Sequence, residues 1–423
     1  MSGAGQYPVA DPTQLGVAVD WPTLEPGRHV PARASTWIET LSLTNFRNYT
    51  QVSLTLEPSP VVLVGSNGAG KTNLLEAVSL LAAGQGLRRA PYPDLARVLA
   101  GDASPPTAPG AGWTVAAHLN TPSGGIDIGT GLAPGGALGE RTGRIVRLNG
   151  ATQAGSGVLA DHVEMVWLTP AMDGLFTGSG SDRRRFLDRL ILCFDPGYRR
   201  RVSHFERAMQ SRNRLLADDV RERSRFEGLE RIMAETGVAM AAARAEIVTA
   251  LAATIAARRE RAPDSPFPWG TLALDGALER RLETTPALDV EDAYFALLAT
   301  GRDRDRAAGR TLEGPHRSDL QVGHGPKSMP AKLCSTGEQK ALLIGLVLAH
   351  AELVARARDG ASPILLLDEI AAHLDPQRRA ALYREILILG AQAWMTGTDP
   401  EAFAALAGKA QILCVEDGRL MRI

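Results

Sequence analysis

The chain has 423 residues, and at about 150 residues per domain this length predicts two or three domains. Lysine and arginine total 46 against 47 acidic residues. The resulting net charge of −1 excludes a uniformly basic nucleic-acid coat and an acidic tail protein, but not a local basic patch. Three cysteines without zinc-binding spacing predict reduced thiols. No signal peptide is predicted, and no apolar run approaches 18 residues. These features predict a cytoplasmic protein with no membrane-spanning helix.

The N-terminal part predicts an extension followed by a strand-rich segment. Residues 1–35 contain five prolines and few aromatic side chains, which is typical of a flexible extension. Apolar and polar residues alternate in 36–43 and 52–56, which predicts strands, and VVLV at 61–64 predicts a short buried strand. The helical spacing of apolar residues in 73–83 predicts a helix directly after this strand.

The middle and the end of the chain differ in composition. Residues 101–160 are rich in glycine and proline and predict short antiparallel strands joined by glycine turns. Residues 182–261 contain 18 arginines and 12 acidic residues, a net charge of +6, and predict helical hairpins in a separate lobe. A long apolar helix is predicted over 338–358. Further strands are predicted in PILLLDEI at 363–370, AQAWMTGTD at 391–399 and AQILCVEDGRLMRI at 410–423.

The strongest motif is a phosphate-binding loop between the predicted strand at 61–64 and the following helix. It matches the pattern GxxxxGK[ST] in full and consists of Gly65, Ser66, Asn67, Gly68, Ala69, Gly70, Lys71 and Thr72. Its glycines allow backbone N–H groups to converge on phosphate oxygens, and the helix N-terminus adds partial positive charge. We expect Lys71 to reach the β- and γ-phosphates of ATP and the Thr72 hydroxyl to bind Mg²⁺.

A pair of acids follows the apolar strand ILLL nearly 300 residues later. Asp368 at the strand end is predicted to hold Mg²⁺, directly or through water. Glu369 is predicted to polarise the attacking water as the general base. An acid pair after an apolar strand is a weak signal alone, but together with the phosphate loop it indicates the second half of an ATPase site.

A third segment precedes the long predicted helix and consists of Ser335, Thr336, Gly337, Glu338 and Gln339. Its hydroxyl and backbone donors could bind a phosphate, or the segment could be only a helix N-cap with a stabilising acid. Its position between the phosphate loop and the acidic strand is the layout of ABC-type ATPases. In that class, the signature of one subunit closes over ATP held by the other. Residues 372–375, ending in Asp375, fit the D-loop of the class.

Six segments occur in a specific order along about residues 36–423. They are TNFRNYT at 44–50, GSNGAGKTNLLEA at 65–77, DRRRFLDRLI at 182–191, GRTLEGPHRSDL at 309–320, STGEQKALL at 335–343 and DEIAAHLD at 368–375. This succession resembles the RecF family of bacterial DNA replication and repair proteins. That family is similar to the SMC-like ATPases but lacks their long coiled coil, and no sustained heptad array is present in this sequence.

The resemblance implies an α/β fold: an ABC-type P-loop ATPase head with an antiparallel β subdomain, an inserted helical lobe and no long coiled coil. It further implies an ATP- and Mg²⁺-dependent homodimer that binds duplex and gapped DNA, hydrolyses ATP slowly and is stimulated by DNA. Such proteins act with RecO and RecR to load recombinase at single-strand gaps, and they feed the SOS response. By resemblance, residues 65–72 form the phosphate loop and 335–339 the signature. Asp368 is the acid of the Mg²⁺ site, Glu369 the hydrolytic acid and Asp375 the acid of the D-loop. Arg47 lies near the nucleotide phosphates.

Some positions depart from the family or stay open. Ser318 stands where the family tends to have an acid, which weakens any role for this position. The polar Q-loop falls near 168–173, and Thr398 is a weak candidate for the place of the switch histidine of ABC transporters. Arg183, Arg184 and Arg185 could contact DNA phosphates or could form a solvated helix start beside acidic neighbours. With aromatic residues at 5%, we expect recognition of the DNA backbone rather than base stacking.

Three other functions fit the motifs less well. The main alternative is the cytosolic ATPase subunit of an ABC transporter, but TNFRNY, GPHR and the missing switch histidine argue against it. A non-hydrolysing scaffold is disfavoured by Glu369, and a small-molecule kinase by the signature-type helix. The predicted domains are the extension 1–35, an ATPase lobe 36–180, a helical arm lobe 181–305 and a C-terminal head part 306–423.

Overall fold

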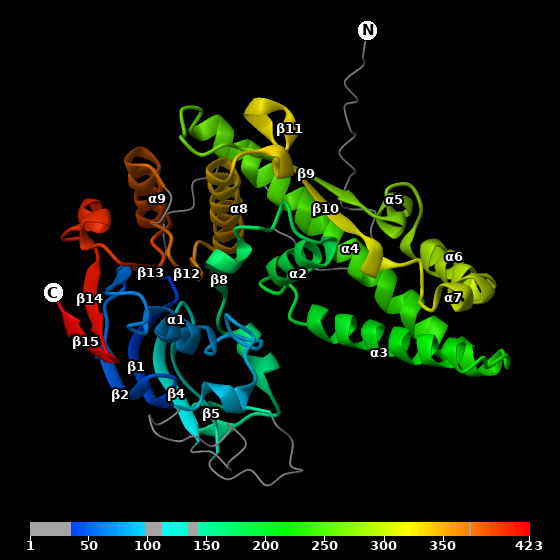
Figure 1. Cartoon of the computed structure of the whole chain (residues 1–423), viewed down its shortest axis with the longest axis horizontal. Coiled ribbons are helices and arrows are strands. Elements are labelled where there is room, and N and C mark those ends of the chain that lie inside the picture. The colour runs from blue at the N-terminus through cyan, green and yellow to red at the C-terminus, as the bar shows by residue number, and fades with distance from the viewer. Residues whose placement is uncertain (1–34, 98–111, 134–142, 372–373) are drawn as a thin grey trace. The chain divides into compact units, whose positions relative to one another are not determined.

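The computed structural model describes residues 35–97, 112–133, 143–371 and 374–423. These residues form two compact units, each assembled from separate stretches of the chain (Figure 1). The described part of the helical unit is 174–258 and 269–334. The sheet unit takes the described residues up to 173, then 259–268 and those from 335 onward. The predicted extension lies outside the described residues except for residue 35, and the predicted division at 180 and 305 stays a prediction.

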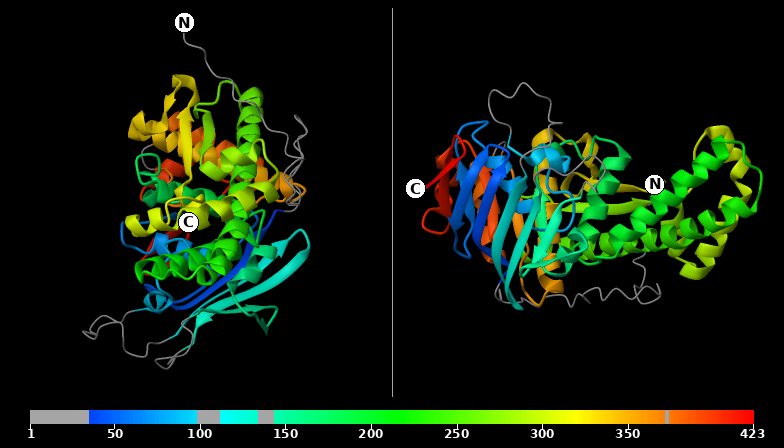
Figure 2. Two further views of the ribbon diagram at one scale, coloured as in Figure 1. Left: turned by 90° about the vertical axis from the view of Figure 1, so that its right-hand side faces the viewer. Right: turned by 90° about the horizontal axis from the view of Figure 1, so that it is seen from below.

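An antiparallel sheet forms one layer of the sheet unit, as the alternating sequence predicts. Its strand order is β2-β1-β4-β5-β6-β7, and the neighbouring strands β2, β1, β4 and β5 are seen in blue to cyan in the right view of Figure 2. The buried positions of β1 include Ile38, Leu41 and Leu43, which face the core. The strands are β1 Trp37–Phe46, β2 Tyr49–Thr55, β4 Trp113–Thr121, β5 Gly124–Leu132, β6 Ile145–Leu148 and β7 Ala151–Thr152.

A second, mostly parallel sheet carries the strands that precede the predicted motifs. Its order is β15-β14-β3-β13-β12-β8, and only β15 runs antiparallel to its neighbour. All four residues of β3 and of β12 are buried, which explains their uninterrupted apolar runs. The strands are β3 Val61–Val64, β8 Met165–Leu168, β12 Ile364–Leu367, β13 Ala393–Gly397, β14 Gln411–Glu416 and β15 Arg419–Arg422.

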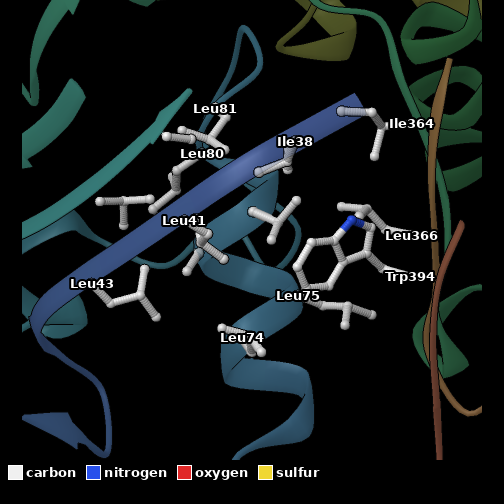
Figure 3. Close-up of a cluster of buried hydrophobic side chains, with 14 of the residues drawn as sticks. Ile38, Leu41, Leu43, Leu74, Leu75, Leu80, Leu81, Ile364, Leu366 and Trp394 are labelled. Atoms are coloured by element: carbon white, nitrogen blue, oxygen red, sulfur yellow. The ribbon is translucent and has the colours of Figure 1, made fainter. Parts of the chain in front are cut away.

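The core of the sheet unit lies between the two sheets and helix α1 (Lys71–Ser79). Figure 3 shows Leu74 and Leu75 of α1 packed among side chains of β1, β12 and β13, including Trp394. Gln392 joins the layers, because its amide exchanges hydrogen bonds with both backbone groups of Ile38 at 2.9 and 3.0 Å. Helices α8 (Thr336–Ala357) and α9 (Pro376–Leu389) complete the unit. The predicted helix over 338–358 is thus confirmed with a start two residues earlier.

The helical unit confirms the predicted helices of residues 182–261. Its helices are α2 Gly180–Ile191, α3 Tyr198–Ala217, α4 Ser224–Arg261, α5 Ala277–Leu282, α6 Ala287–Thr300 and α7 Arg302–Ala308, the last residues of α4 belonging to the sheet unit. A small antiparallel sheet contains β9 Gly270–Asp275, β10 Asp319–His324 and β11 Met329–Pro330. Short 3-10 turns of both units span Tyr92–Leu95, Ser156–Asp161, Pro170–Met172, Pro315–Arg317, Gly325–Lys327, Ala331–Leu333 and Pro400–Leu406.

Helix α4 contains a strongly apolar window that the search for uninterrupted apolar runs in the sequence did not detect. By length and composition it could cross a membrane, with a mean hydropathy of 1.6 over its most apolar window. The structure buries 61% of that window, a pattern that the core helix of a soluble protein also shows. The apolar composition of α4 is therefore accounted for by packing within the helical unit.

Candidate functional site

The phosphate loop connects β3 to α1 in the sheet unit, in the context that the motif requires. Gly70 has a φ of 116°, which favours glycine, and a Cβ there would lie 2.3 Å from the Asn48 amide nitrogen. A Cβ on Gly65 would lie 2.3 Å from the backbone oxygen of Val415. Side chains are therefore excluded at both ends of the loop, and its backbone N–H groups can approach a phosphate closely.

Lys71 lies at the start of α1 and folds back over the loop. Its Nζ donates to the backbone oxygens of Gly65 at 2.7 Å and Ser66 at 2.8 Å, and the residue is buried. Burial lowers the pKa of Lys71 from its ordinary value, while the nearby carboxylates of Glu369 and Asp368 raise it. The ammonium is thus held where it can exchange carbonyl oxygens for phosphate oxygens.

Thr72 and Asp368 lie together although 296 positions separate them in the sequence. The Thr72 hydroxyl donates to Oδ1 of Asp368 at 2.9 Å. The pair offers a hydroxyl and a carboxylate oxygen, the hard donors that Mg²⁺ prefers. Among the described residues, no group of three or more His, Cys, Asp or Glu side chains could hold a metal alone. The donor set therefore fits Mg²⁺ that takes its other ligands from phosphates and water.

Glu369 follows the strand end with an exposed side chain and a left-handed backbone. Its φ of 49° is uncommon for a residue with a side chain. The backbone N–H of Glu369 donates to Oγ1 of Thr396 at 2.7 Å, and the same hydroxyl donates to Oδ1 of Asp368 at 2.8 Å. Thr396 therefore fixes both acids at once, and it is fully buried.

Thr396 was not predicted from the sequence, which suggested Thr398 two positions later. The signal was available in the strand register: β12 and β13 are parallel neighbours in which Leu367 pairs with Met395, so the next residues, Asp368 and Thr396, are adjacent. Among the described residues, Thr398 forms no hydrogen bond with either acid, whereas Thr396 binds both. Sequence spacing alone therefore did not identify Thr396 as the residue beside the acid pair.

Replacing Thr396 by valine is expected to slow ATP hydrolysis about 10- to 100-fold and to change the ATP KM much less. Loss of one hydrogen bond to a charged group typically costs about 1.5–3 kcal/mol, and the Glu369 N–H also loses its acceptor. Steady-state kinetics over a range of ATP concentrations measure the two constants separately. Thr396→Ser keeps the hydroxyl and should restore most of the rate.

A matched control for this prediction is Thr254→Val, which removes an equally buried hydroxyl from helix α4. It should leave the hydrolysis rate near that of the wild type. If Thr396→Val hydrolyses ATP at the wild-type rate, or if the serine variant is as slow as the valine variant, the positioning role is wrong.

The segment TNFRNY holds the phosphate loop through hydrogen bonds to the backbone oxygens of the loop. Asn48 donates to the backbone oxygen of Ala69 at 3.0 Å, and the Tyr49 hydroxyl donates to that of Gly70 at 2.9 Å. Burial raises the pKa of Tyr49, so its hydroxyl stays a donor at physiological pH. Neither residue was singled out from the sequence, because their contacts are with residues 21 positions away.

Arg47 occupies a different position from its two neighbours. Its guanidinium binds both carboxylate oxygens of buried Glu76 on α1, at 2.9 and 3.1 Å, and donates to the backbone oxygen of Asp94. Arg88 also lies 3.4 Å from the same carboxylate. Arg47 thus orients the helix that follows the phosphate loop, and its expected place near the nucleotide phosphates stays a prediction.

The predicted signature begins helix α8 with a reciprocal capping box. The backbone N–H of Ser335 donates to the carboxylate of Glu338 at 3.0 Å, and the N–H of Glu338 donates to the Ser335 hydroxyl. Ser335 and Thr336 are exposed, Gly337 is half-buried, and Gln339 is buried. The predicted N-cap is therefore present, and it leaves the first residues of the segment accessible.

Two further predicted segments adjoin this helix or the acid pair. Lys340 on α8 lies 3.3 Å from the Asp173 carboxylate, at the end of the predicted Q-loop. Asp375 caps α9 by accepting the N–H of Arg378 at 2.9 Å, and its side chain is half exposed. Ala372 and His373 of the predicted D-loop lie outside the described residues.

Arg183, Arg184 and Arg185, for which the sequence left open a DNA contact or a helix start, form contacts within the helical unit. Arg183 binds both oxygens of Asp319 at 2.7 and 2.8 Å, Arg184 donates to the backbone oxygen of Ser318, and Arg185 pairs with Asp182. These contacts favour the structural interpretation of the triplet.

Ser318, the departure from the family pattern, has a structural contact of its own. It is buried and donates to the Glu279 carboxylate at 2.6 Å. His316 in the same segment contacts the backbone oxygen of Thr311 at 3.0 Å, and burial lowers its pKa. The described contacts of GPHRSDL therefore organise the helical unit.

Comparisons with known proteins agree with this geometry. Residues 40–99 match a family model described as "AAA domain". A protein of Mesorhizobium japonicum named "DNA replication and repair protein RecF" is 56% identical over 386 residues, which cover 91% of this chain and 97% of that protein. A solved structure described as "Structure of the recombination mediator protein RecF-ATPrS in RecFOR pathway" covers 93% of this chain and 100% of that one, with a TM-score of 0.79 at 20% identity.

A more distant structural likeness links the fold to the SMC heads. An Smc head domain from Pyrococcus furiosus, with an extended coiled coil and the C-terminal domain of ScpA, covers 92% of this chain and 96% of that one. Its TM-score is 0.51 at 18% identity. The predicted α/β ATPase-head fold is therefore confirmed.

Proposed function

The chain belongs to the RecF family of DNA replication and repair proteins, and on this premise we propose that it is an ATP-dependent DNA-binding protein of recombinational repair and replication-fork maintenance. ATP acts as a switch that closes two copies into a dimer, and slow hydrolysis reopens the dimer. The observation that carries this proposal is the hydrogen bond from Thr72 to Asp368, which unites the phosphate loop with the acid pair.

Each residue of this site has a distinct task. The loop 65–70 and Lys71 bind the phosphates, and Thr72 with Asp368 would hold Mg²⁺, which neutralises phosphate charge when bound. Glu369 accepts a proton from the water whose oxygen attacks the γ-phosphorus while the bond to ADP breaks. Its exposed side chain beside a buried Asp368 supports this division of roles.

The accessibility of the signature segment supports the proposed dimer. Ser335 and Thr336 are exposed at the N-terminus of α8, where partial positive charge gathers. We propose that residues 335–339 and Asp375 of one copy complete the nucleotide site of the other. The DNA-free rate of hydrolysis is then low, and DNA that favours the closed dimer raises it.

The finer cellular roles extend the same proposal. The dimer binds duplex DNA and single-strand gaps in the cytoplasm, acts with RecO and RecR, helps to load recombinase and contributes to the SOS response. The name of the Mesorhizobium japonicum relative supports repair and replication as the setting. No observation among the described residues favours the alternative of a transporter subunit.

Sedimentation velocity with ATP, ADP or no nucleotide, each with and without gapped duplex DNA, tests this function. We expect a monomer without nucleotide and with ADP, a dimer with ATP, and a faster complex when DNA is added to the ATP sample. Identical sedimentation in ATP and ADP would contradict the ATP switch. An ATP-bound dimer whose sedimentation does not change when DNA is added would contradict the DNA-binding role.

A further inference from the structure

One face of helix α3 (Tyr198–Ala217) is buried in the helical unit. Its buried residues are Tyr198, Phe205, Ala208, Arg212 and Leu216. Arg212 is completely buried and binds the carboxylates of Glu230 at 3.0 Å and Asp305 at 2.7 Å. These contacts fix the rotation of α3 about its axis, so its opposite face points to solvent.

The solvent face of α3 carries Arg200, Arg207 and Arg214, which we call the α3 arginine stripe. All three side chains are exposed. Seven residues are nearly two helical turns, so these positions lie along one side of the helix at intervals of about 10.5 Å. Arg199 is exposed beside the start of the stripe. The helix lies along an edge of the helical unit in Figure 1, beside α4.

The charge of this stripe is not neutralised within the part of the chain that the structure describes. None of its three arginines forms an ion pair there, and Arg207 donates only to the backbone oxygen of Ser203. Glu206 is the single acid among the residues of α3. The buried arginines Arg212 and Arg244 are paired with carboxylates. A row of like charges without counterions is the surface that a polyanion would bind.

We infer that the α3 arginine stripe binds the phosphate backbone of duplex DNA, an inference that rests on the proposed function and assigns its DNA contact. Guanidinium groups suit phosphate because they donate two parallel hydrogen bonds. The aromatic residues of α3, Tyr198 and Phe205, are both buried, so the face offers no platform for stacking of unpaired bases. Backbone contact with a duplex is therefore favoured over single-strand binding.

The test is a triple variant, Arg200→Gln, Arg207→Gln and Arg214→Gln, in the full chain. Its affinity for a mixed-sequence duplex of about 30 base pairs, measured with ATP at 0.1 M salt, should fall on the order of a hundredfold. The slope of log affinity against log salt should become shallower by about 0.9 per lost phosphate contact, up to about 2.7 in total. Dimerisation by ATP and hydrolysis without DNA should stay within about twofold of the wild type, because these residues lie outside the nucleotide site.

The matched control removes the same number of arginines at positions outside α3: Arg280→Gln, Arg281→Gln and Arg310→Gln, all exposed in the helical unit. It should bind the duplex nearly as well as the wild type. If the two triple variants have equal duplex affinities and salt slopes, the α3 arginine stripe is not the duplex-binding surface. The same conclusion holds if the stripe variant loses affinity only for single-stranded DNA. A wild type that binds no duplex in ATP overturns the proposed function itself, which separates the two failures.

Discussion

Replacing Lys71 by alanine is expected to weaken ATP binding about a hundredfold or more and to abolish the ATP-dependent dimer. The ammonium is the phosphate loop's own charged side chain, and each charge-assisted hydrogen bond that it would give to phosphate is worth about 1.5–3 kcal/mol. Titration with a fluorescent ATP analogue measures the affinity, and sedimentation velocity in saturating ATP measures the dimer.

The fold should survive this substitution, because Lys71 bonds only backbone oxygens of its own loop. A suitable control is Lys409→Ala, which removes an exposed lysine elsewhere in the same unit. The role of Lys71 is contradicted if its alanine variant binds ATP and dimerises like the Lys409 variant.

Replacing Glu369 by glutamine is expected to reduce ATP hydrolysis about 10²- to 10⁴-fold while ATP binding persists. The amide keeps the size of the side chain and leaves the backbone bond to Thr396 intact, but it cannot accept the proton of the attacking water. The ATP-bound dimer should therefore accumulate. Phosphate release and the lifetime of the dimer after dilution into ATP-free buffer measure the two effects.

A contrasting variant separates Glu369 from its neighbour. Asp368→Asn should weaken Mg²⁺-dependent ATP binding, because Asp368 is the acid that contacts Thr72. If Glu369→Gln retains wild-type hydrolysis, another base removes the proton. If both variants lose ATP binding equally, the division of roles between the two acids is wrong.

Local sequence predicted the parts of this site whose geometry is local. The glycines of 65–70, the buried strand before them and the helix after them follow from spacing within a short window. The capping box of Ser335 and Glu338 can also be recognised from a spacing of three residues. Such features depend on backbone preferences and hydrogen bonds within one or two turns.

Contacts between distant segments were not predictable in the same way. Thr396 acquires its role only when β13 pairs with β12 in one register, and Asn48 only when TNFRNY packs behind the phosphate loop. Arg183 has its carboxylate partner 136 positions away, so the sequence around it suggests a free basic cluster. Residues 319–324 pair with 270–275, which places a segment of the predicted head part in the helical unit.

The position of β3 in its sheet has a consequence for synthesis of the protein. Both neighbours of β3 are strands from the end of the chain, β13 and β14. At about 5–20 residues per second, a ribosome needs roughly 15 to 65 seconds to proceed from Val64 to Ala393. During that time the hairpins of the antiparallel sheet can form, whereas β3 has neither edge paired. Any nascent chain that stalls before Ala393 therefore exposes an apolar strand, and chaperone binding to such intermediates should cease once β13 and β14 have emerged.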